Sequence, residues 1–105
     1  MRVLIDACLP VELKSLLEAT EVKTARDVGW QTLENGALLE KANDRFDVLL
    51  TMDKAMPSQQ VLEKFDVGVV LIKARSNRIA DLTDLKAKIQ AAIKHCARGS
   101  ATVVS

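Results

Sequence analysis

Two unbroken apolar runs restrict the fold of this chain more than any other feature of its sequence. They are DVLLT at 47–51 and VGVVLIK at 67–73. A strand with one face in water alternates apolar and polar residues, whereas a strand covered on both faces in a parallel sheet is apolar throughout. The two runs therefore predict buried strands of a parallel sheet that has helices on both of its faces.

Short strand patterns alternate with helix patterns along the rest of the chain. Further strands are predicted at 2–5, at 21–24 and, as an edge strand, at 101–105. Helices are predicted from Pro10 to about residue 19, from 37 to about 43, as a short turn opened by Pro57, and as one long amphipathic helix from Ile79 to Ile93. This alternation predicts one α/β domain over residues 1–105, with an open, mostly parallel sheet of four to five strands flanked by helices.

The charge balance and the small number of aromatic residues limit the kinds of partner. Lys and Arg number 15 against 14 for Asp and Glu, so the net charge of +1 gives no overall attraction to nucleic acid, and such binding needs a local patch. Aromatic residues make up 3%, too few for base stacking to dominate. No apolar run reaches the roughly 18 residues of a membrane span, and the run at 2–5 is too short for a secretory signal. We therefore expect a soluble, cytoplasmic protein with two reduced cysteines and no membrane partner.

Acidic residues follow two of the predicted strands. Asp6 comes directly after the run at 2–5, and Asp53 comes shortly after the run at 47–51. Ligands of open parallel sheets bind beyond the carboxyl ends of the strands, so the two carboxylates meet at one crevice if these strands are neighbours. Glu34, near the start of the second predicted helix, is a third candidate.

Carboxylates that gather at one place repel one another unless a divalent cation neutralises them or one of them stays protonated. Oxygen ligands favour Mg²⁺ or Mn²⁺, and such an ion can activate water and stabilise a phosphate during hydrolysis. The pattern thus predicts a metal site formed by Asp6, Glu34 and Asp53. The structural alternative is that Asp6 and Glu34 cap helix amino termini and that Asp53 begins a turn.

Several polar side chains lie next to the predicted strand ends and are candidates for substrate binding. They are Lys54, Gln59, Gln60, Arg75, Asn77 and Arg78. The segment KARSNR at 73–78 follows the fourth strand, and its arginines could bind phosphate oxygens, each guanidinium in a bidentate manner. Alternatively, these arginines form ion pairs with Asp81 or Asp84 on a solvated loop.

Four segments of the chain resemble, in order and spacing, the successive motifs of the small single-domain PIN-like proteins, which are relatives of PIN-domain ribonucleases. The segments are VLIDACLP, VGWQTLENGALLEKA, FDVLLTMDKAMPSQQ and VGVVLIKARSNRIADL. The resemblance extends over most of the chain. It implies a PIN-like α/β fold, an acidic crevice of Asp6, Glu34 and Asp53 that holds Mg²⁺ or Mn²⁺, and hydrolysis of RNA phosphodiesters, often by a toxin that is paired with an antitoxin protein.

Departures from this family pattern leave other functions open. Ala7 and Cys8 stand where the family usually has Glu and Asn, and Ala55 stands where many members have a polar or acidic residue. Fewer ligands would hold the cation more weakly, so a non-catalytic module that binds RNA or a partner protein is an alternative. DVLLTMDKAMP is also similar to the phospho-acceptor motif of receiver domains, with Asp53 as the acceptor. A homodimer could form through the edge strand at 101–105 or through the long helix.

Overall fold

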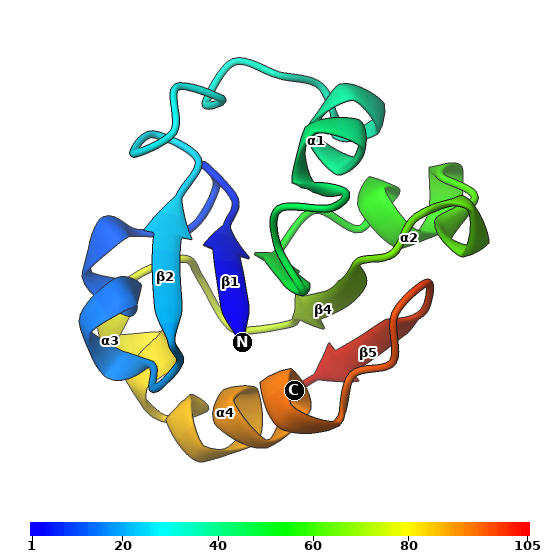
Figure 1. Cartoon of the computed structure of the whole chain (residues 1–105). Coiled ribbons are helices and arrows are strands. Elements are labelled where there is room, and N and C mark those ends of the chain that lie inside the picture. The colour runs from blue at the N-terminus through cyan, green and yellow to red at the C-terminus, as the bar shows by residue number, and fades with distance from the viewer.

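Five parallel strands form the sheet at the centre of the computed structural model, which describes residues 1–105 (Figure 1). They are β1 (Arg2–Ile5), β2 (Glu21–Thr24), β3 (Val48–Thr51), β4 (Gly68–Ile72) and β5 (Ala101–Val104). Every strand predicted from the sequence is present, and every strand pair is parallel. The predicted class, an open α/β sheet flanked by helices, is confirmed.

The strand order is β2-β1-β3-β4-β5, so the chain changes its winding direction between β1 and β3. These two strands are direct neighbours, with Leu4 opposite Leu49. At such a switch point the connections after the two strands leave the sheet in opposite directions, and a crevice opens beyond the strand ends. The pairing of β1 with β3 meets the condition under which the acidic residues after these strands can lie at one crevice.

Helical segments cover both faces of the sheet (Figure 1). They are the 3₁₀ helices η1 (Val11–Leu16) and η2 (Leu62–Lys64) and the α-helices α1 (Asn35–Ala42), α2 (Ala55–Gln59), α3 (Ile79–Thr83) and α4 (Lys86–His95). One face packs against η1, α3 and α4, and the other face packs against α1, α2 and η2. None of these helices has the length and apolar character needed to cross a membrane.

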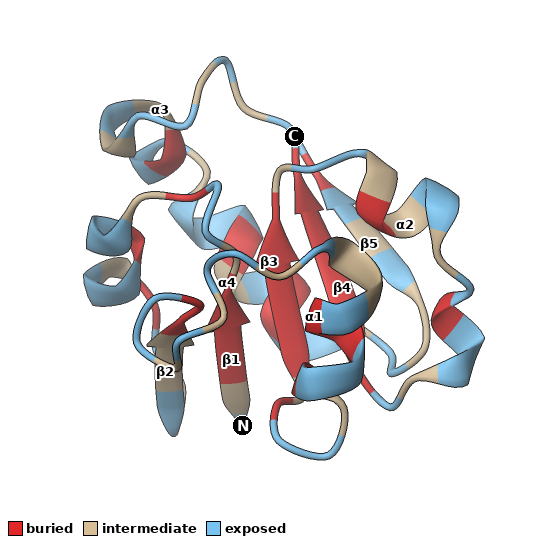
Figure 2. Cartoon of the chain, turned by 90° about the horizontal axis from the view of Figure 1, so that it is seen from above, coloured by how far each residue is buried: buried red, intermediate tan, exposed pale blue.

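The central strands supply side chains to both cores because successive residues of a strand point to opposite faces. Val3 and Leu50 belong to the core under α3 and α4. Leu4 and Leu49 belong to the core under α1 and α2. Figure 2 shows β3 and β4 buried along their whole length, as the unbroken apolar runs predict.

The first predicted helix is wrong in type and length, because η1 is a 3₁₀ helix that ends at Leu16. Pro10 precedes it in an extended conformation and is not its first helical residue. Side chains three residues apart lie above one another in a 3₁₀ helix. Leu13 and Leu16 have this spacing, and both pack against the same core.

The long helix predicted from Ile79 to Ile93 is also wrong, because it is divided into α3 and α4. The Thr83 hydroxyl donates a hydrogen bond of 2.7 Å to the Ile79 carbonyl, a bond that competes with helical pairing. The break lets α3 pack on η1 while α4 packs along β4 and β5. In α2, the helix begins at Ala55, so Pro57 lies inside the first turn, where a backbone N–H has no helical partner.

Candidate functional site

Thr51, the last residue of β3, connects the two acidic residues that follow β1 and β3. Its side chain is buried, and its hydroxyl donates a hydrogen bond of 2.7 Å to Oδ2 of Asp6. The oxygen of the Thr51 hydroxyl in turn accepts a hydrogen bond of 3.0 Å from the backbone N–H of Asp53. Asp6 and Asp53 thus flank one buried side chain at the carboxyl ends of neighbouring strands.

The Asp6 carboxylate is held in one orientation by its surroundings. Its Oδ1 accepts a hydrogen bond of 2.7 Å from the Ala7 N–H, and its Oδ2 lies 3.6 Å from the Cys8 thiol. The Asp6 N–H donates to the Leu50 carbonyl at 2.9 Å, which extends the pairing of β1 with β3 beyond the strand itself. The backbone of Asp6 is therefore held in place by hydrogen bonding to the sheet.

The Asp53 carboxylate is exposed and accepts hydrogen bonds at both of its oxygens. Asn35 donates to Oδ2 at 3.1 Å, and the Ala55 N–H donates to Oδ1 at 2.9 Å. These bonds, the one from Asn35 first, lower the pKa of Asp53 below its usual value against a small opposing effect of burial. Asp53 is therefore ionised at neutral pH.

The structural alternative for the acidic residues is correct for one of the three. Asp53 does begin a turn, because its carboxylate bonds the backbone two residues further on. Asp6 caps no helix, since η1 begins only at Val11. Glu34 occupies the residue before α1, but its side chain makes no capping hydrogen bond.

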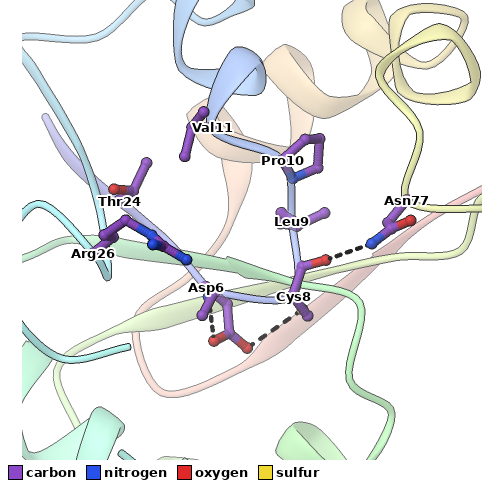
Figure 3. Close-up of a pocket in the computed structure, with 9 residues that line it drawn as sticks. Asp6, Cys8, Leu9, Pro10, Val11, Thr24, Arg26 and Asn77 are labelled. Atoms are coloured by element: carbon purple, nitrogen blue, oxygen red, sulfur yellow. Dashed lines mark hydrogen bonds between the residues drawn. The ribbon is translucent and has the colours of Figure 1, made fainter. Parts of the chain in front are cut away.

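Six of the nine predicted site residues line two separate hollows at this edge of the sheet. Glu34, Asp53, Gln59 and Gln60 line one hollow of about 480 Å³. Asp6 lines a second hollow of about 290 Å³ together with Asn77 (Figure 3). The structure thus brings Glu34 to Asp53 but places Asp6 on the other hollow, and no three His, Cys, Asp or Glu side chains are grouped so as to hold a metal ion.

The carboxylate oxygens of Asp6 and Asp53 are of the kind that binds a hydrated Mg²⁺ or Mn²⁺ ion. Each carboxylate oxygen has about two acceptor positions. Oδ1 of Asp6 and both oxygens of Asp53 accept one hydrogen bond each, so each keeps one position for a further partner. Mg²⁺ is commonly held by one or two carboxylates and several waters, and Asp6 and Asp53 provide two such carboxylates.

The loop after β4 reaches the crevice through one residue. The Asn77 side-chain amide donates a hydrogen bond of 3.3 Å to the Cys8 carbonyl, and Asn77 lines the same hollow as Asp6. Arg75 and Arg78 are exposed and line another hollow of about 430 Å³. Lys54 is exposed beside Asp53 and lines none of the hollows.

The alternative in which the two arginines pair with nearby carboxylates is wrong. Neither Arg75 nor Arg78 forms an ion pair with Asp81 or Asp84. Asp81 instead accepts a hydrogen bond of 2.6 Å from the Ser76 hydroxyl. Both guanidinium groups therefore remain available for an anionic ligand.

The sequence interpretation missed three residues of this region: Arg26, Asn35 and Thr51. Arg26 lines the hollow of Asp6, and its signal was its position just after the predicted strand at 21–24. Thr51 was visible as the polar end of an apolar run. Burial raises the pKa of the Cys8 thiol, and the Asp6 carboxylate raises it further, so this thiol stays protonated at neutral pH.

Comparison with protein-family models, with curated proteins and with solved structures gave no match to this chain. The relationship to PIN-like proteins therefore remains a prediction that rests on the four sequence motifs.

Proposed function

We propose that the crevice beyond β1 and β3 binds Mg²⁺ or Mn²⁺ and hydrolyses phosphodiester bonds of RNA. The observation that supports this most is the Thr51 hydroxyl, which holds Asp6 beside the start of the Asp53 turn at the switch point of the sheet. Two carboxylates held near each other repel, and a divalent cation relieves that repulsion. The PIN-like motifs point to the same chemistry and to control by an antitoxin protein.

Asp6 and Asp53 would hold the ion, with water completing its shell. When bound, the ion would activate water and stabilise the charge that develops on the phosphate. Glu34, which shares a hollow with Asp53, would orient the attacking water or take up its proton. Arg75 and Arg78 would bind phosphate oxygens of the strand.

The polar side chains around these residues would assist in binding the substrate. Lys54 would contact a phosphate beside Asp53, and Asn77 would position the strand next to Asp6. Gln59 and Gln60 line the hollow of Glu34 and would donate hydrogen bonds to the sugar or the base.

Calorimetric titration of Mn²⁺ tests the metal site directly. We expect saturable binding by the wild type and its loss in Asp6→Asn and in Asp53→Asn. Asp66→Asn is the matched control, because it removes the same charge from an exposed residue just before β4, at the opposite edge of the sheet. No binding by the wild type at millimolar Mn²⁺ would contradict the metal site, and RNA cleavage that persists in EDTA would contradict the mechanism.

A non-catalytic binding module is a second candidate. All four carboxylate oxygens of Asp6 and Asp53 already accept hydrogen bonds from the protein, so the crevice keeps its shape without a cation. Ala7 and Ala55 contribute only backbone N–H groups there. This function requires binding of RNA or a partner protein that a chelator leaves unchanged.

The receiver-like alternative has support in the strand order, which flavodoxin-like sheets share. Against it, Ala7 leaves Asp6 without a second acidic residue after β1. We expect acetyl phosphate with Mg²⁺ to leave no acid-labile phosphate on Asp53. Labelling that Asp53→Asn abolishes would instead favour the receiver function.

A further inference from the structure

Arg26 lines the hollow of Asp6 and has no carboxylate partner. The three ion pairs of the protein join Arg2 and Arg98 to Asp47 and Lys14 to Asp27, so Arg26 takes part in none. Figure 3 shows Arg26 and Asn77 on opposite sides of the hollow, with Asp6 between them. An unpaired guanidinium can bind phosphate oxygens through two parallel hydrogen bonds or stack on a flat ring.

The turn that presents Arg26 is held rigidly on both sides of this residue. Before it, Ala25 is buried, and its N–H donates to the Ile5 carbonyl at 2.8 Å. After it, Asp27 accepts hydrogen bonds of 2.9 Å from the Thr24 N–H and from the Lys14 ammonium. The Asp27 N–H donates in return to the Thr24 hydroxyl at 3.0 Å. Arg26 is therefore fixed at its backbone, which lowers the entropy cost of holding a ligand.

The size and lining of the hollow suit a small, partly flat ligand. Its volume of about 290 Å³ is near the lower end of the range for small-molecule sites, roughly 300–1,000 Å³. Leu9, Pro10 and Val11 form an apolar wall. Asn77 uses one N–H on the Cys8 carbonyl, so its amide oxygen remains free as an acceptor and its second N–H as a donor for a base edge.

We propose that this hollow binds one nucleotide of an RNA strand. Arg26 contacts its phosphate, the apolar wall contacts the face of the base, and Asn77 bonds the base edge. The inference rests on the proposed function for the identity of the polymer, because Asp6 lines this hollow and, in the proposed function, would hold the ion beside the bond to be cleaved. A nucleoside monophosphate presents the same chemistry as one nucleotide of a strand, so the test compares the two.

The experiment follows amide shifts of the ¹⁵N-labelled protein during titration in EDTA, first with the four nucleoside 5′-monophosphates and then with a trinucleotide of RNA. Without a metal ion no cleavage occurs, so failure here and failure of the proposed hydrolysis are distinguishable. We expect saturable shifts at 7–11, 24–27 and 77, and tighter binding of the trinucleotide. Arg26→Ala should weaken binding about tenfold or more, the effect of losing a charged hydrogen-bonding group.

Lys94→Ala is the control, because it also removes one positive charge, from an exposed residue near the end of α4 that lines none of the hollows. It should bind like the wild type. Equal loss in both variants, shifts confined to 34–36 and 53–60, or no saturation at millimolar ligand would overturn the inference. If inorganic phosphate reproduced the full set of shifts, the hollow would be an anion site, and the inference would be overturned. If the monophosphate and the trinucleotide bound with equal affinity, the hollow would be a site for free nucleotides, and the inference would be overturned as well.

Discussion

The Thr51 hydroxyl donates a 2.7 Å hydrogen bond to Oδ2 of Asp6, from the end of β3 to the residue after β1. The same hydroxyl oxygen accepts the N–H of Asp53, so one buried side chain sets the positions of both acidic residues. In the proposed metal site Thr51 would orient both ligands, and loss of such an orienting group usually weakens metal binding about 10- to 100-fold.

Replacement of Thr51 by Val tests this arrangement. The change keeps the shape of the side chain but leaves Asp6 without its donor and the Asp53 N–H without its acceptor. We expect Mn²⁺ affinity to fall about 10- to 100-fold, measured by calorimetry. Thr51→Ser keeps the hydroxyl and should retain most of the affinity, so equal binding by the wild type and Thr51→Val would contradict the positioning role.

Asn35→Ala should raise the pKa of Asp53. The Asn35 amide is the largest cause of the lowered pKa of this carboxyl, and its removal leaves only the Ala55 N–H to stabilise the charge. The measurement is the pH titration of the Asp53 side-chain carboxyl by ¹³C NMR. Gln59→Ala is the control, because Gln59 lines the same hollow but makes no hydrogen bond to Asp53. An unchanged Asp53 titration in Asn35→Ala would show that the hydrogen bond is absent in solution.

Asp27 should make unfolding depend on pH in acid. The Thr24 N–H first, and then Lys14, lower the pKa of Asp27 from 3.8 to about 2. Its folded pKa is depressed, so its contribution to stability is present above pH 3.8 and is lost as the pH falls toward 2. We expect Asp27→Asn to reduce the slope of the unfolding free energy between these pH values, measured by urea denaturation. A slope equal to that of the wild type would contradict this role of Asp27.

Gly68, at the start of β4, has no room for a side chain. A Cβ atom there would lie 2.6 Å from the Cys96 sulfur and 3.0 Å from the Ala97 carbonyl oxygen. We expect Gly68→Ala to lower the free energy of unfolding by about 1–3 kcal/mol, measured in urea, as overpacking of a core usually does. In the Cys96→Ala background the cost should be smaller, because the sulfur is gone. Equal costs in both backgrounds would assign the strain to the Ala97 carbonyl alone.

Much of the candidate site could be predicted from local sequence. Asp6 and Asp53 were found because each follows an apolar run, and parallel strands end at one edge of a sheet. Arg26 was missed because the weak strand at 21–24 could not be assigned a neighbour. Its place beside Asp6 depends on the pairing of β2 with β1, which brings together residues distant in sequence.

The sequence by itself determined the fold class and the two buried strands, because side-chain periodicity and unbroken apolar runs reflect the immediate surroundings of a strand. Only the tertiary structure decided that α3 and α4 are separate, since that break serves packing on two different partners, η1 and the sheet. It also placed Asp6 and Glu34 on separate hollows. Strand order and the direction of each connection are settled by long-range burial, which no local pattern contains.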